Sequence, residues 1–199
     1  MTVKGRRAEY AEATRSALLD AGRRLFIERR YAELSAEEIA KDARLTRGAV
    51  YHHFGGKQGL FEAVFEQVEQ ELTDRLTSAL GQAGASWDTV VLGVNVFLDE
   101  CTDVAYQRIV LQEGPFALGW DRWRELDERY MVGLIRDLVD ELSRADALVH
   151  RSPELTVRAI YGLLTELAWS LADTTDEQTR GEAGQLALTM IGALRRDTE

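Results

Sequence analysis

The chain has 199 residues, of which 45% are hydrophobic and 29% charged, a composition that is ordinary for a soluble globular protein. Its single cysteine, Cys101, excludes an internal disulfide framework and a cysteine-based zinc site, and the sequence has no run of about eighteen apolar residues that would predict a membrane span. The net charge of −10 is unevenly distributed, because residues 1–60 carry 12 Lys and Arg against 8 Asp and Glu, whereas residues 61–199 carry 12 against 26.

Three helices are predicted in the first part of the chain. Apolar residues at three- and four-residue spacing indicate a helix over residues 10–30 with one buried face. Ser35 followed by Glu38 is the pattern of a capping box and predicts a short helix over residues 36–43. An N-cap threonine then predicts another short helix over residues 46–54. Because only two residues separate the short helices, they must cross steeply, which is the helix-turn-helix geometry.

The remainder of the chain predicts six further helices, with a loop at residues 113–115 and no strand pattern or internal repeat. We therefore expect an all-α fold of about nine helices, with a three-helix helix-turn-helix domain in residues 1–56 and a larger helical domain in residues 57–199. The six helices are expected at Lys57–Gly81, Trp87–Cys101, Val104–Gln112, Trp120–Leu142, Pro153–Asp173 and Asp176–Arg196.

The start of the second short helix carries the side chains that a helix in a DNA major groove needs. Arg47 lies at the helix tip, where its planar guanidinium could bind the two acceptors of a guanine. The Thr46 hydroxyl could reach a phosphate, and Gly48 lets the backbone approach DNA closely. The positive charge of residues 1–60 suits phosphates, although it also fits an ordinary solvated surface.

The same pattern continues along the segment. Tyr51, His52 and His53 are expected to project outward near the DNA backbone, and Lys57 adds a charge where free amides favour a phosphate. Adjacent histidines point about 100° apart on a helix, so we expect no metal site there. Each residue also has an ordinary structural interpretation, and only the ordered set favours DNA binding.

Residues 35–60, SAEEIAKDARLTRGAVYHHFGGKQGL, resemble the DNA-binding module of the TetR family of transcriptional regulators. Arg44 departs from the family pattern, which usually has glycine in the turn. A positive backbone angle at Arg44 would cost on the order of 1 kcal/mol. The residues that match the family pattern are Ser35, Ile39, Ala40, Ala43, Thr46, Gly48, Tyr51, His53, Phe54, Lys57 and Leu60.

The resemblance implies a DNA-binding surface that includes the matching residues Ser35 and Gly48. By position, Arg47 and His52 would read bases. The residues that would hold phosphates are Thr46, Tyr51, His53 and Lys57.

In that family the C-terminal helices bind a small molecule and dimerise. The resemblance thus implies a cytoplasmic, ligand-responsive repressor that acts as a homodimer on a palindromic operator. It would bind an unidentified small-molecule effector and dimerise through its last two helices. A dimer is also favoured because one helix-turn-helix makes few base contacts, although the apolar stripes of these helices could simply cover the chain's own core.

Aromatic side chains in the middle helices are candidates for an effector pocket, although such stripes more often belong to a core. Trp87 adds to the aromatic surface, and Glu113, Arg122 and His150 could add polar contacts. The predicted ligand-binding residues are Phe97, Phe116, Trp120, Trp123, Tyr130, Tyr161, Glu166 and Trp169.

Two other functions were weighed against DNA-binding regulation. An enzyme is not expected, because the sequence contains no phosphate loop, nucleophile elbow, zinc-protease motif or supported carboxylate pair, and no cofactor is indicated. An all-helical protein-interaction module without DNA binding is the alternative. The retained docking residues Arg47, Tyr51, His53 and Lys57 argue against it.

Overall fold

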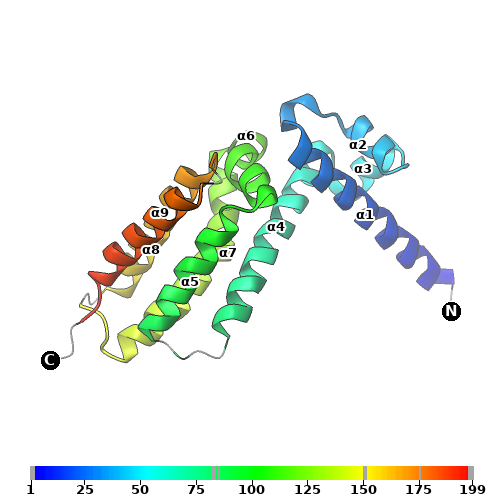
Figure 1. Ribbon diagram of the computed structural model, residues 1–199. Coiled ribbons are helices and arrows are strands. Elements are labelled where there is room, and N and C mark those ends of the chain that lie inside the picture. The colour runs from blue at the N-terminus through cyan, green and yellow to red at the C-terminus, as the bar shows by residue number, and fades with distance from the viewer. Residues whose placement is uncertain (1–2, 82–83, 85, 150–151, 175, 197–199) are drawn as a thin grey trace. The chain divides into compact units, whose positions relative to one another are not determined.

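The computed structural model describes residues 3–81, 84, 86–149, 152–174 and 176–196, with side chains from residue 8 onward. In this part of the chain every regular secondary-structure element is a helix (Figure 1). Nine of these elements are α-helices, which confirms the predicted all-α fold. No described helix is long and apolar enough to cross a membrane. The elements are α1 (Val3–Glu28), η1 (Tyr31–Glu33), α2 (Ala36–Asp42), α3 (Arg47–Phe54), α4 (Lys57–Leu80), α5 (Trp87–Glu100), η2 (Tyr106–Glu113), α6 (Gly114–Leu118), α7 (Trp120–Arg144), α8 (Pro153–Leu171) and α9 (Glu177–Gly192).

The predicted loop at residues 113–115 is wrong. The π-helical segment η2 runs directly into the short helix α6, whose first turn contains Pro115. Proline has no backbone N–H, but the first turn of a helix does not need one, so the residue starts α6 instead of ending a helix.

The chain divides into two compact units, which are described separately. The first contains residues 1–68 and 108–123, and the second contains residues 69–107 and 124–199. In the first unit α1 packs against α2 and α3. Its core contains three aromatic rings, with the centroid of Phe61 4.9 Å from that of Phe26 and 5.2 Å from that of Tyr31. Since these rings come from α1, η1 and α4, they hold the three elements together.

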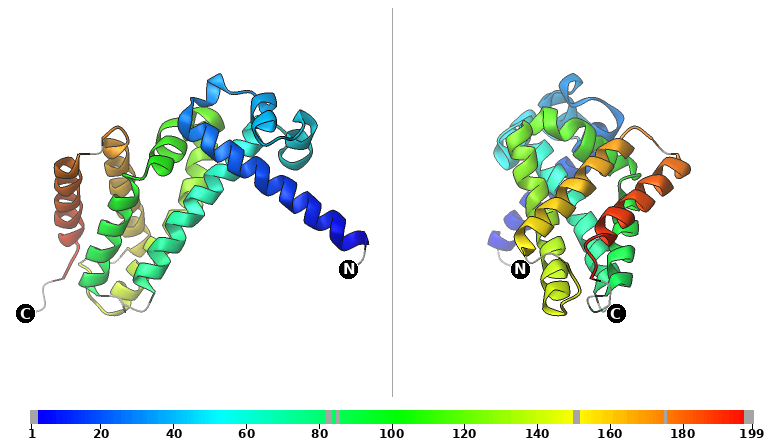
Figure 2. Two further views of the ribbon diagram at one scale, coloured as in Figure 1. Left: turned by 45° about the vertical axis from the view of Figure 1, so that its right-hand side comes forward. Right: turned by 90° about the vertical axis from the view of Figure 1, so that its left-hand side faces the viewer.

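The second unit is built from the later part of α4 with α5, α7, α8 and α9. Helices α5 and α8 both pack against α9 (Figure 2). The side-chain amide of Gln107 donates hydrogen bonds to the carbonyls of Leu171 and Thr174, at 2.8 and 3.1 Å. These bonds satisfy acceptors at the C-terminal end of α8 that have no partner within the helix.

The turn between α2 and α3 is a Schellman motif. The Leu45 N–H donates to the Ala40 carbonyl at 2.8 Å, and the Arg44 N–H donates to the Lys41 carbonyl at 3.0 Å. Arg44 itself has φ +56°, a left-handed conformation that normally favours glycine. The positive backbone angle considered for Arg44 from the sequence is therefore confirmed, and the turn keeps its geometry by accepting local strain.

The connection between α3 and α4 depends on three glycines. Gly55 and Gly56 have φ +74° and +135°, which reverse the chain after α3. Gly59 lies so close to the end of α3 that a Cβ atom there would be 1.9 Å from the Phe54 carbonyl oxygen. Because the obstacle is backbone, no rotamer change can relieve the overlap.

We predict that Gly59→Ala destabilises the first unit by about 3 kcal/mol or more, because α3 and α4 must separate to admit the methyl group. Thermal unfolding followed by circular dichroism measures the loss. Gly133→Ala is the matched control, because a Cβ at Gly133 meets no atom within 4 Å, and alanine there should be neutral or slightly stabilising. Equal unfolding midpoints for Gly59→Ala and the wild type would contradict the prediction.

We also predict that Arg44→Gly stabilises the protein by about 0.5–1 kcal/mol, because glycine relieves the positive φ but adds freedom to the unfolded chain. Arg44→Ala is the control, since it removes the same side chain and keeps the strain. Denaturant unfolding should place Arg44→Gly above both the wild type and Arg44→Ala. A midpoint for Arg44→Gly at or below that of Arg44→Ala would show that the turn is not strained.

Candidate nucleic-acid interface and regulatory cavity

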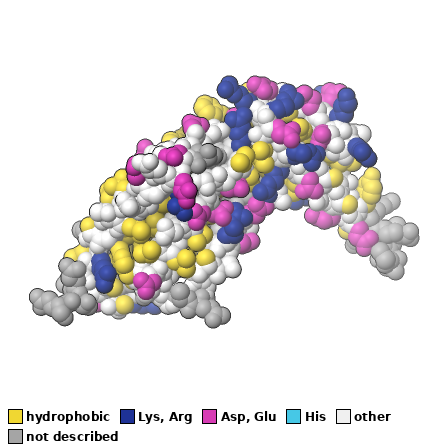
Figure 3. Space-filling view, viewed as in Figure 1, with side chains coloured by type: hydrophobic (Ala, Val, Ile, Leu, Met, Phe, Trp, Pro, Cys, Tyr) yellow, Lys and Arg dark blue, Asp and Glu magenta, His cyan; other side chains and the backbone are white. Residues whose placement is uncertain are grey.

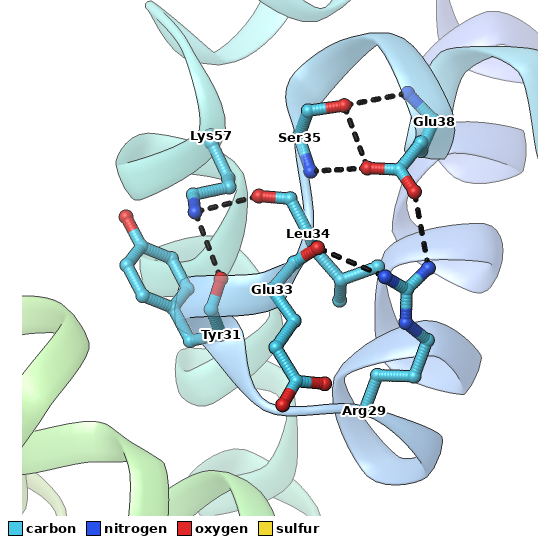
Figure 4. A network of polar contacts seen from close by, with 7 residues as sticks. All are labelled: Arg29, Tyr31, Glu33, Leu34, Ser35, Glu38 and Lys57. Carbon is cyan, nitrogen blue, oxygen red and sulfur yellow. Dashed lines mark hydrogen bonds and ion pairs between the residues drawn. The ribbon is translucent and has the colours of Figure 1, made fainter.

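The capping box predicted at the start of α2 is confirmed. The Glu38 N–H donates to Ser35 Oγ at 3.2 Å, and the Ser35 N–H donates to Glu38 Oε2 at 2.9 Å. Arg29 Nη1 lies 3.1 Å from Glu38 Oε1, which ties α1 to the same carboxylate (Figure 4). The Ser35 hydroxyl, followed by the Ser35 backbone and Arg29, lowers the pKa of Glu38, so the cap remains charged at neutral pH and suits the positive end of α2.

Helix α3 buries one face and leaves the predicted docking residues on the other. Val50 is fully buried, whereas Arg47, Tyr51 and His52 are exposed and His53 is half-buried. Arg47 Nη2 donates to the Tyr51 hydroxyl at 3.2 Å, and the guanidinium carbon lies 5.2 Å from the centre of the Tyr51 ring. This pair, one turn apart, holds the Arg47 side chain against the helix with the remaining guanidinium donors available.

Thr46 and Gly48 have little role in the internal packing of the first unit. Thr46 occupies the predicted N-cap position with an extended backbone, but its hydroxyl makes no capping hydrogen bond. A Cβ at Gly48 would meet only Thr46 Oγ1, at an ordinary 3.7 Å. The open groove beside these two residues is also lined by Tyr10 and Arg44. Neither side chain was predicted to lie in the interface, because Tyr10 is more than thirty residues away in sequence and Arg44 departs from the family pattern.

Lys57 is held by backbone carbonyls of the first unit. Its Nζ donates to the carbonyl oxygens of Tyr31 and Leu34 at 2.8 and 2.7 Å, and lies 3.9 Å from the centre of the Tyr31 ring (Figure 4). Partial burial lowers the pKa of the Lys57 ammonium. Two of its three donors are used to join η1 to α4, so the predicted phosphate contact must rely on the third.

The second unit encloses an apolar cavity with a volume of about 80 Å³. Since one water needs about 10–15 Å³ on this scale, the space can accept a small apolar group. The cavity is lined by side chains from five helices, among them Leu76 of α4, Phe97 of α5, Met131 of α7, Leu164 of α8 and Ile191 of α9.

Of the eight predicted ligand-binding residues, only Phe97 lines this cavity, together with Trp87 from the wider aromatic set. Trp123 belongs to the core of the first unit, where its Nε1 donates to the Val110 carbonyl at 2.9 Å. His150 lies outside the described residues. The remaining seven of the eight do not line the cavity. Phe116, Trp120 and Glu166 are exposed, Tyr130 and Trp169 are half-buried, and Trp123 and Tyr161 are buried elsewhere.

Two buried carboxylates in the second unit were missed from the sequence. Glu69 of α4 is 0% exposed, and neither of its carboxylate oxygens has a hydrogen-bond partner among the described residues. Asp127 of α7 is also buried and accepts a hydrogen bond from the Tyr161 hydroxyl. The available signal was positional, because each acid falls on the apolar face of its helix, Glu69 four residues after Phe65 and three before Leu72.

Burial raises the pKa values of these acids. Desolvation, and secondly the nearby Asp127 carboxylate, raises the pKa of Glu69 well above its ordinary value. Desolvation also raises the pKa of Asp127 to about 6, although the hydrogen bond from Tyr161 acts in the opposite direction. The two acids therefore share a small, poorly solvated space in which full ionisation of both is unfavourable.

Comparisons with known proteins agree with this geometry. Residues 18–64 match the family described as "Bacterial regulatory proteins, tetR family", and residues 87–194, more than half of the chain, match "Tetracyclin repressor-like, C-terminal domain". A crystal structure of a TetR-family transcriptional regulator from Pectobacterium atrosepticum is 33% identical, with a TM-score of 0.79 over 96% of this chain and 98% of that chain.

Two further relatives have more specific names. The HTH-type transcriptional regulator SrpR of Pseudomonas putida is 25% identical over 96% of this chain and 89% of its own length. NalD of Pseudomonas aeruginosa, the secondary repressor of the MexAB-OprM multidrug efflux pump, is 28% identical, with a TM-score of 0.64 over 96% of this chain and all of that chain. The helix-turn-helix exposes Arg47 on α3, and both parts of the chain match TetR-family descriptions. The chain therefore belongs to the TetR family of DNA-binding transcriptional regulators.

Proposed function

We propose that the protein is a ligand-responsive repressor that binds a palindromic operator as a homodimer. The observation that carries this proposal is the exposed face of α3, where Arg47, Tyr51 and His52 lie in the solvent although Val50 of the same helix is fully buried. Residues 1–56, together with Lys57 at the start of the next domain, would contact DNA, and residues 57–199 would bind the effector and dimerise. The matches of residues 18–64 and 87–194 to separate family descriptions support a division into an N-terminal and a C-terminal part.

We assign the DNA contacts by the geometry of α3 in a major groove. Arg47 and His52 would read base edges, whereas Thr46, Tyr51, His53 and Lys57 would hold phosphates. Gly48 would allow close approach, since the packing of the chain itself leaves room for a side chain there. Ser35 would act indirectly by capping α2, because its hydroxyl is occupied by Glu38.

Homodimerisation through α8 and α9 is supported by apolar side chains that these helices leave in solvent. Leu155 of α8 is 70% exposed, and Leu186 and Met190 of α9 are 50% and 51% exposed. Hydrophobic side chains gather on the part of the surface where α8 and α9 lie (Figure 3). Two such helices from each of two subunits would bury these side chains in a four-helix bundle.

Repression that depends on an effector is supported by the cavity of the second unit and by the relative NalD, which is a repressor. Ligand binding would favour a conformation in which the two copies of α3 no longer match successive major grooves. The coupling free energy between ligand and DNA would then set the strength of induction.

Selection of binding sites from random duplex DNA tests the function directly. A dimeric regulator should enrich a palindrome with half-sites about one helical turn apart. Retention of no particular sequence at low salt would contradict operator binding and would instead favour a protein-interaction module.

We predict that Arg47→Ala and Lys57→Ala weaken binding to the selected operator in different ways. Arg47→Ala should reduce discrimination between operator and altered half-sites roughly 10- to 100-fold, because a base contact is lost. Lys57→Ala should weaken binding to all sequences alike and lower stability by about 1 kcal/mol, because two part-buried carbonyls lose their donor. Fluorescence anisotropy and thermal unfolding measure the two effects. Unchanged discrimination in Arg47→Ala would remove its assigned role, and unchanged stability in Lys57→Ala would remove the structural one.

We predict that Leu186→Glu combined with Met190→Glu converts the protein to a monomer, because four charges would have to be buried at the centre of the dimer. Size-exclusion chromatography with light scattering measures the mass. Leu92→Glu is the control, since Leu92 is an exposed leucine on α5. A double variant that remains a dimer would place the interface elsewhere.

A further inference from the structure

The buried acids of the second unit lie one or two helical turns from residues that line the apolar cavity. Asp127 is one helical turn from the cavity-lining residue Met131 on α7, and Tyr161 is one turn from Leu164 on α8. Glu69 precedes the lining residue Leu76 by two turns on α4. Glu69, Asp127 and Tyr161 each lie at three-, four- or seven-residue spacing from a lining residue of their helices, so they continue the helix faces that form the cavity wall.

These two acids form a buried cluster without an ion pair in the part of the chain that the structure describes, and burial raises the pKa of Asp127 more than the charge of Arg124 lowers it. Among the described residues, no Lys, Arg or His forms an ion pair with Glu69 or Asp127, and both oxygens of Glu69 have no hydrogen-bond partner. A buried polar group without a partner costs free energy that a hydrophobic residue of similar size would avoid. The cluster therefore lacks a positively charged hydrogen-bond donor.

Two tyrosines near the acids, Tyr106 and Tyr161, would help to bind a positively charged hydrogen-bond donor. Tyr106 is buried next to the acids, and the carboxylates of Glu69 and Asp127 both raise the pKa of its hydroxyl after the larger effect of burial. The tyrosine hydroxyl of Tyr161 donates to Asp127 and thereby orients that carboxylate. Two carboxylates with two tyrosines offer charge, hydrogen-bond acceptors and aromatic surface to a cation. No group of three or more metal-binding side chains occurs in the described part of the chain, so an organic cation fits these residues better than a metal ion.

We propose that Glu69 and Asp127 form the head-group subsite of the effector pocket and that the effector is an organic cation with an apolar body, such as a lipophilic amine. The ammonium group donates to the carboxylates of Glu69 and Asp127, and the apolar body fills the cavity lined by Phe97, Met131 and Leu164. This inference rests on the proposed ligand response and names the chemical class of the ligand.

The test compares three probes that share one body and differ in head group: 4-phenylbutylamine, 4-phenylbutan-1-ol and 4-phenylbutyrate. Isothermal titration calorimetry on the full-length wild type should give a dissociation constant for the amine at least ten-fold lower than for the alcohol, with the carboxylate weakest. Glu69→Gln should lose this preference by weakening the amine at least ten-fold and the alcohol less than two-fold. Glu141→Gln removes a solvent-exposed carboxylate from α7 and should bind all three probes as the wild type does.

Three results would overturn the proposal: no amine binding at millimolar concentration, equal binding of amine and alcohol by the wild type, or an undiminished preference in Glu69→Gln. The comparison of amine with alcohol on the wild type tests the proposal without any variant. Asp127→Asn is the second variant to be used if Glu69→Gln does not fold. Operator binding of the same preparations is measured in parallel. Operator binding without amine preference rejects the cation subsite and leaves the regulator intact, whereas absence of operator binding rejects the proposed function itself.

Discussion

The approach of Gly59 to the Phe54 carbonyl, where even a methyl group would overlap with backbone, allows α3 and α4 to meet end to end. The same junction is secured by Lys57, whose ammonium binds two carbonyls of the η1 region. Charge-assisted hydrogen bonds of this kind are stronger than neutral ones, so a short helix is fixed that could not be stable alone. The exposed face of α3 around Arg47 depends on this junction, because an eight-residue helix keeps one face toward solvent only if its other face is held.

The two compact units hold ionisable side chains of opposite sign without an ion pair among the described residues: Arg47 and Lys57 in the first unit, and Glu69 and Asp127 in the second. In the first unit, cations such as Arg47 and Lys57 remain oriented without being neutralised by carboxylates: one is held by a phenol and the other by carbonyls. Their charge is therefore still available to a polyanion. In the second unit, Glu69 and Asp127 are removed from water without an ion-pair partner among the described side chains. The first arrangement favours contact with phosphates, and the second favours uptake of positive charge.

A regulator needs its ligand site to be less than optimally stable when empty. A protein core gains most from apolar packing, and a carboxyl group such as Glu69 in the same place reduces that gain. A ligand that satisfies the carboxyl recovers free energy only in conformations that keep the subsite intact, and differential binding of this kind shifts a conformational equilibrium. The unsatisfied acids are thus compatible with a domain whose conformation responds to its ligand.

Local signals in the sequence determined the all-α fold, the helix-turn-helix, the capping box at Ser35, the strained turn at Arg44 and the exposed face of α3, because helical periodicity and capping depend on residues within one or two turns of each other. Tertiary structure alone decided which carbonyls Lys57 would bind and that Glu69 would share a buried space with residues of α7 and α8. Those outcomes depend on groups tens of residues apart, whose proximity no periodicity encodes. Most of the predicted aromatic pocket did not form around the cavity for the same reason: an apolar stripe specifies that a face is buried, but not which neighbour covers it.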